Sequence, residues 1–199
     1  VEALFIEADG FGTKLQRVKR GEKRRKEVKP AIIHEGWVRR QGRDGKEDYR
    51  LLNPKYIAIT EEKKDFWEEV RGILQAEYKD IEGIPVIING DGASWIREGA
   101  EHFGKGLYQY DRFHVAKKLN EALREYPEVL KSAQKALKAN DMGQLLCLII
   151  DAWQKAAPAE QREKLTEIKD ILIENHEYIR DYRLRLKEAG WKVNDSWRS

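Results

Sequence analysis

The chain has 199 residues, of which 41% are hydrophobic and 37% are charged, and its net charge is only +3. This length suffices for one domain or two small ones, and no apolar run approaches the roughly 18 residues that cross a bilayer. A membrane-spanning protein is therefore excluded, and we expect a cytoplasmic one, because the single Cys147 cannot form an internal disulfide. Cys147 lies within LLCLII, which predicts a buried, inert thiol.

The first 60 residues have the composition of β-strands. Apolar alternation marks residues 4–7, and strand-like patterns follow at 12–18, 28–38 and 49–60, the last with a break at Asn53-Pro54. The Asp44-Gly45 dipeptide is typical of a hairpin turn. Consecutive strands joined by short turns predict an antiparallel meander.

Helices and buried strands then alternate. Residues 61–78 read as an amphipathic helix with Thr60 as its N-cap, and residues 84–88 form a continuous apolar run between glycines, typical of a strand covered on both faces. A short helix at 94–103 and a strand at 107–110 follow. The first 112 residues therefore predict an α/β domain with a mixed sheet, three antiparallel strands followed by parallel ones.

Residues 113–199 predict a separate helical subdomain. Apolar spacings of three, four and seven indicate helices at 113–126, 127–139, 141–156 and 158–189. Pro127 suits the first turn of a helix, and Gly190 is the expected stop of the last one.

Two aspartates stand where strands end. Asp9 follows LFIEA on the same strand face as Glu7, and Asp91 stands between two glycines after the run 84–88. If the two strands are neighbours, the carboxylates converge, and at roughly 4 Å they repel by about 4 kcal/mol at an effective dielectric near 20. Bound Mg²⁺ or Mn²⁺ would relieve this repulsion. The alternative is that both are ordinary Asp-Gly turn residues.

Two further groups of polar residues invite a functional interpretation. Asp111 and His114 are three apart at a strand-to-helix junction and can share a helix face, as a site-shaping pair or simply as a cap and a packed ring. The segment KRGEKRRK places six basic residues in eight, which suits either a solvated hairpin tip or contact with DNA phosphates. These residues are Lys19, Arg20, Lys23, Arg24, Arg25 and Lys26.

Four motifs in order resemble bacterial insertion-sequence transposases of the DDE class, most closely the ISLre type. They are LFIEADGFGTKLQR, VKPAIIHEGW, VIINGDGASWI and YDRFHVAKKL. The resemblance implies an RNase H-like core followed by an all-helical insertion. It also implies that Asp9 and Asp91 are the first two metal-binding acids, and that Asp111 and His114 form the D-x-x-H element, shaping the site or contacting DNA.

The resemblance also implies a function for the parent enzyme. That enzyme would use Mg²⁺ or Mn²⁺ to hydrolyse a phosphodiester at the element's end, and then attack target DNA with the freed 3′-hydroxyl. We expect its partners to be transposon-end and target DNA, bound by a homo-oligomer, with no membrane involved. Two alternatives remain open: an RNase H-like nuclease or resolvase, and a domesticated remnant that only binds DNA.

The third acid of the resemblance has no match in this sequence. Glu7, Glu98 and Glu177 are acids outside the matching motif, and the helix that would carry the third acid is expected after Ser199. Together with a start that enters a strand almost at once, this predicts a fragment that binds divalent metal poorly and cleaves little or no DNA.

Overall fold

The computed structural model describes residues 1–14, 25–41, 47–60, 65–156, 159–194 and 197. The chain divides into two compact units, Val1–Tyr108 with Val193–Ser199, and Gln109–Lys192. The last seven residues thus belong with the α/β unit, in which the Trp197 ring lies edge-on to Phe5, with 6.1 Å between centroids. In the described segments, no helix combines the length and hydropathy needed to cross a bilayer.

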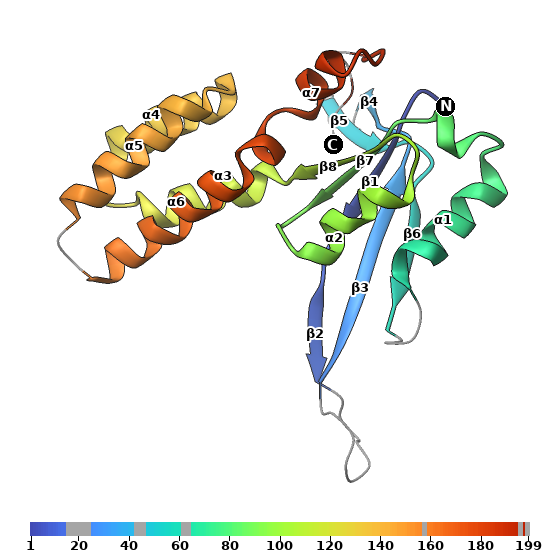
Figure 1. Ribbon diagram of the computed structural model, residues 1–199, viewed down its shortest axis with the longest axis horizontal. Coiled ribbons are helices and arrows are strands. Elements are labelled where there is room, and N and C mark those ends of the chain that lie inside the picture. Colours follow the sequence, from blue (N-terminus) through green and yellow to red (C-terminus); the bar gives the residue numbers. More distant parts are fainter. Residues whose placement is uncertain (15–24, 42–46, 61–64, 157–158, 195–196, 198–199) are drawn as a thin grey trace, which may run out of the picture. The chain divides into compact units, whose positions relative to one another are not determined.

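The first unit is built on a mixed sheet, which confirms the predicted α/β class (Figure 1). β3 pairs antiparallel with β1 on one edge and with β6 on the other, whereas β1 pairs parallel with β7. β8 lies next to β7, and β4 and β5 form a separate two-stranded sheet. The strands are β1 Leu4–Ala8, β2 Phe11–Lys14, β3 Arg25–His34, β4 Trp37–Gln41, β5 Glu47–Leu51, β6 Lys55–Ile59, β7 Val86–Gly90 and β8 Gly106–Tyr110.

One predicted strand is wrong, and the break predicted in another is present. The run 28–38 is not one strand, because β3 ends at His34 and β4 begins at Trp37, and Gly36 between them adopts a φ of 113° that favours glycine. The run 49–60 divides into β5 and β6, as the Asn53-Pro54 break indicated.

Helices α1 Phe66–Glu77 and α2 Ser94–Glu98 pack together in the first unit, with short 3₁₀ turns at Ile81–Gly83 and Gly99–His102. The indole Nε1 of Trp67 donates to the carbonyl of Trp95 at 2.6 Å. The N-cap of α1 is Asp65, whose side chain accepts from the backbone N–H of Trp67, so the prediction of Thr60 was wrong. Asp65 is the N-cap because its short carboxylate accepts a hydrogen bond from a free backbone N–H of the first turn.

The second unit contains α3 Arg112–Ala122, α4 Pro127–Ala139, α5 Met142–Lys155, α6 Ala159–Ile179 and α7 Tyr182–Glu188. α4 packs on α5, and α6 packs on both α5 and α3. The predicted helix at 158–189 is interrupted twice: α6 is kinked at Asn175, whose φ and ψ are not helical, and Asp181 leaves the helical conformation and caps α7 by accepting from the N–H of Arg183. Its apolar stripe is buried as predicted: Leu165, Ile168, Leu172, Ile179, Tyr182 and Leu186.

Cys147 is exposed, which corrects the prediction of a buried thiol. On α5 the buried residues are Leu145, Ile149 and Ala152, spaced by three and four. Cys147 lies two positions after Leu145, which is roughly 200° around a helix with 3.6 residues per turn. An apolar run in a helix therefore reaches the exposed face as well as the buried one.

Candidate metal centre

The two aspartates follow neighbouring parallel strands. The register of β1 and β7 pairs Leu4 with Val86 and continues to Glu7 with Asn89. Asp9 and Asp91 stand two residues beyond that last pair, one residue past the end of each strand. Because paired residues of parallel strands point to the same face, continuing this register puts both aspartates on one face, with Cα atoms about 5 Å apart.

Each aspartate is anchored by one oxygen. Asp9 Oδ1 accepts from the N–H of Gly10 at 2.7 Å, and Asp91 Oδ1 accepts from the N–H of Ala93 at 3.2 Å. Both residues are exposed, and no described residue hydrogen bonds to either Oδ2. One fixed and one open carboxylate oxygen per residue is a suitable arrangement for a hard cation such as Mg²⁺.

The pair provides only part of a coordination shell. Over the residues whose placement is described, no group of three or more His, Cys, Asp or Glu side chains is arranged to hold a metal ion. Mg²⁺ usually takes one or two protein carboxylates and completes its shell with waters and substrate phosphates. The two aspartates therefore fit a cation that is shared with a phosphate-containing substrate.

A strand interruption sets the position of Asp9. β1 and β2 pair with β3 in one register, in which Asp9 lies opposite Pro30. The N–H of Asp9 donates to the carbonyl of Pro30 at 3.2 Å, but Pro30 has no N–H to return a bond. The ladder loses one hydrogen bond at this position, and the strand is broken at Asp9 and Gly10.

A cluster of polar residues lies two residues before the aspartates on the same strands. Asn89 Nδ2 donates to Glu7 Oε1 at 3.3 Å, and His34 Nε2 lies 3.5 Å from the same oxygen. His34 is fully buried, its Nδ1 lies 3.1 Å from the amide nitrogen and 3.2 Å from the carbonyl oxygen of Gly36, and its Nε2 faces the carboxylate of Glu7. The cluster ties β1 to both neighbouring strands immediately before the aspartates.

His34 and Asn89 were not predicted from the sequence to belong to this cluster. Alternation placed Glu7 on the face of Asp9, but nothing local showed which residues of other strands face it. The sequence signal for these two residues was a polar side chain inside an apolar run. Examples are the histidine of AIIH and the asparagine of VIIN.

Asp111 and His114 form a pair within the second unit. Asp111 caps α3, with Oδ1 accepting from the N–H of Phe113 at 2.8 Å, and its Oδ2 lies 2.8 Å from His114 Nδ1. The carboxylate orients the ring and favours the tautomer with its proton on Nδ1, which leaves Nε2 as an acceptor. The His114 side chain is 40% exposed, so solvent or a ligand can reach this nitrogen.

The predicted basic run lies mostly outside the described residues. Lys19, Arg20, Lys23 and Arg24 fall in the segment 15–24, which the structure does not describe. Arg25 begins β3, and Lys26 is exposed on the same strand, opposite Thr13 of β2.

Comparisons with known proteins agree on one family. The family described as "Uncharacterised protein family (UPF0236)" matches residues 1–197. UPF0236 protein TTE2489 of Caldanaerobacter subterraneus subsp. tengcongensis is 32% identical over 184 residues, which cover 92% of this chain and 37% of the relative. The UPF0236 protein in the vanSb 3' region of Streptococcus gallolyticus is 30% identical over 189 residues, covering 92% of this chain and 40% of the relative.

A third relative, also from Caldanaerobacter subterraneus, is 29% identical over 183 residues, and its name joins eleven designations from TTE0033 to TTE2212. The chain spans between 37% and 40% of the length of these three relatives. With its family match extending over nearly every residue, the chain belongs to the UPF0236 family.

Proposed function

We propose that this chain is part of the catalytic core of a DNA transposase of the DDE class, with an RNase H-like fold. In the complete protein, Asp9 and Asp91 hold Mg²⁺ or Mn²⁺ at the site where a DNA phosphodiester is hydrolysed and its 3′-hydroxyl is joined to target DNA. The protein works on transposon-end and target DNA as a homo-oligomer.

The strand register carries this proposal. The parallel pairing of β1 with β7 brings the end of each strand to the same edge of the sheet, and each strand is followed directly by an aspartate. Two open carboxylate oxygens on one face are a reasonable starting arrangement for divalent cations. Neither aspartate alone, in an Asp-Gly turn, would suggest a metal.

The sheet order supports the same proposal. β6, β3, β1, β7 and β8 are successive neighbours, with the first three strands antiparallel and β7 parallel to β1. This order, with helices between β6 and β7 and between β7 and β8, supports the RNase H-like core that the transposase resemblance implies. The all-helical segment after β8 matches the implied insertion.

The comparisons add an independent argument. A name that joins eleven designations is what a gene carried in several copies of one genome would receive, and two further relatives have joined names of four and two designations. A mobile element multiplies the gene of its own transposase, whereas a housekeeping nuclease has no such reason to recur.

The residues present would divide the work as follows. The bound cations would supply charge neutralisation at the scissile phosphate and activation of the attacking oxygen. The open oxygens of Asp9 and Asp91 would hold these cations, while the N–H groups of Gly10 and Ala93 keep the carboxylates oriented. His114, oriented by Asp111, would act as a hydrogen-bonding group toward DNA.

The decisive experiment measures DNA cleavage by the complete protein. In Mg²⁺, the protein should nick DNA at an element end and form strand-transfer products, and Asp9→Asn or Asp91→Asn should lower the rate of both steps by at least about 10³-fold while DNA binding persists. Nicking of branched DNA without strand transfer would replace the proposal by a nuclease or resolvase. DNA binding without any metal-dependent nicking would indicate a non-catalytic remnant.

A further inference from the structure

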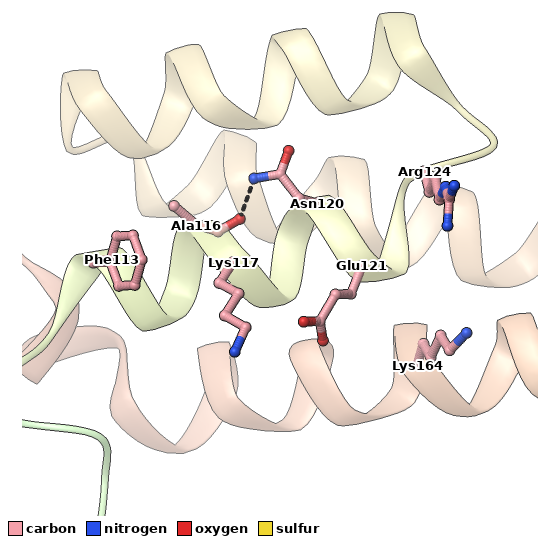
Figure 2. A pocket seen from close by; sticks show the side chains of 7 residues that line it. All are labelled: Phe113, Ala116, Lys117, Asn120, Glu121, Arg124 and Lys164. Carbon is pink, nitrogen blue, oxygen red and sulfur yellow. Dashed lines mark hydrogen bonds between the residues drawn. The ribbon is translucent and has the colours of Figure 1, made fainter. Parts of the chain in front are cut away.

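A groove runs along α3 on the side that faces α6 within the helical unit. It has a volume of about 580 Å³. Figure 2 shows Phe113 at one end of the α3 stretch and Arg124 at the other, with Lys117 and Glu121 between them on one side of the helix. The lining residues are Phe113, Ala116, Lys117, Asn120, Glu121, Arg124 and Lys164.

The groove carries excess positive charge. Lys117 lies on α3, and Arg124 lies in the turn two residues past the end of this helix. Both are exposed, and neither forms an ion pair with any residue that the structure describes. Lys164, from α6, pairs with Glu160 at 2.7 Å, and Glu121 is the acidic member of the lining.

An exposed aromatic ring lies at the end of the groove opposite Arg124. Phe113 is 71% exposed, and its ring contacts that of His114 edge-on, with 6.0 Å between centroids. A single exposed hydrophobic side chain is ordinary by itself. An exposed ring in a groove with two unpaired cations is a combination found where single-stranded nucleic acids bind, since the cations meet phosphates and the ring stacks on a base.

We propose that this groove binds a single DNA strand, with phosphates on Lys117 and Arg124 and an unpaired base stacked on Phe113. The positive charge of the groove and its exposed ring indicate a single-stranded nucleic acid as the ligand. The choice of DNA over RNA rests on the function proposed above. An acidic peptide would use the cations but would leave the exposed ring without a role.

The test measures fluorescence anisotropy of a short labelled single strand titrated with this chain at several salt concentrations. Lys117→Gln/Arg124→Gln should weaken binding roughly tenfold at low salt and reduce the slope of log affinity against log salt by about 1.4, since each single-strand phosphate contact contributes about 0.7. The matched control is Lys131→Gln/Lys138→Gln, two exposed lysines on α4 with the same spacing of seven and the same loss of charge.

Phe113→Ala should lower single-strand affinity by roughly fivefold or more without changing the salt slope, whereas Phe113→Trp should retain it. All these positions are exposed, so melting curves should match those of the wild type. Equal losses in the groove and control double variants would overturn the proposal, because binding would then follow net charge alone. Equal affinity for duplex DNA, or tighter binding of an RNA strand or a poly-glutamate peptide, would also overturn it.

This outcome is separable from the catalytic proposal. If strand binding follows the predictions while the complete protein shows no metal-dependent nicking, the groove assignment stands and the transposase function fails. If the complete protein nicks DNA but the groove variants do not change single-strand affinity, only the groove proposal is refuted.

Discussion

Neutralising Asp9 and Asp91 in turn tests whether their carboxylates adjoin. Asparagine is nearly isosteric and keeps the Oδ1 that accepts from Gly10 or Ala93, so each substitution removes charge but not the local turn. Two unit charges about 5 Å apart in water repel by about 1 kcal/mol. Without metal at low salt, either single substitution should raise the free energy of unfolding by up to about this amount.

The informative quantity is the double-mutant cycle. Each single substitution removes the whole repulsion between the pair, so Asp9→Asn/Asp91→Asn should gain no more than one of them, a departure from additivity of about 1 kcal/mol that high salt reduces. The control pairs Asp9→Asn with Asp80→Asn, an exposed aspartate whose Oδ1 accepts from the N–H of Gly83. That control pair should be additive.

The assay is urea unfolding in EDTA, repeated with Mn²⁺. A cation held at about 100 times its Kd should stabilise the wild type by about 2.7 kcal/mol, and both single variants should lose most of this gain. Additive effects in EDTA within about 0.3 kcal/mol, with the same Mn²⁺ stabilisation in all variants, would refute the reasoning that places the two carboxylates at one site.

Three further substitutions test the structure around the site and in the helical unit. In Gly90→Ala, the new Cβ would lie 2.5 Å from Cγ2 of the buried Ile96, so the free energy of unfolding in urea should fall by about 1–3 kcal/mol. Burial raises the pKa of Asp181, but hydrogen bonds and charge from Arg183 outweigh it and hold the pKa below its usual value. A depressed carboxyl pKa stabilises the fold above the unfolded-state pKa, so this stabilisation should be lost as the pH falls below about 4. In Asp181→Asn, the melting temperature should therefore fall less steeply with decreasing pH than in the wild type. Gly190→Ala, at a φ of +77°, should cost about 1 kcal/mol, measured by the same melting curves.

The element order was readable from the sequence because most signals were local. α4 begins at Pro127 and ends at Ala139 as predicted, since proline at the first turn and a left-handed Asn140 mark its ends. The errors arose where a local cap competed with a continuing apolar pattern. The stripe of α6 continues into α7, so periodicity alone did not reveal that Asp181 interrupts the helix.

The candidate site was only half readable. Alternation fixed the face of Glu7 and Asp9, and the glycines flanking Asp91 marked the end of a strand. Which strand would lie beside which depends on pairing between residues far apart, such as the hydrogen bond between Asn89 and Glu7, 82 positions apart. No local pattern carries that information, and the buried contact of His34 with Glu7 is hidden for the same reason.

The proline opposite Asp9 shows how fold and site depend on each other. A residue with an N–H at position 30 could return a hydrogen bond to the carbonyl of Asp9 and continue the ladder from β1 into β2. Pro30 cannot, so β1 ends one residue before the carboxylate, at the level where β7 ends before Asp91. The two strands therefore end together, and each is followed by an exposed aspartate. A backbone N–H holds one oxygen of each carboxylate, which leaves two open oxygens at one edge of the sheet. An N–H at position 30 would complete that ladder, so the interruption before Asp9 is set by Pro30.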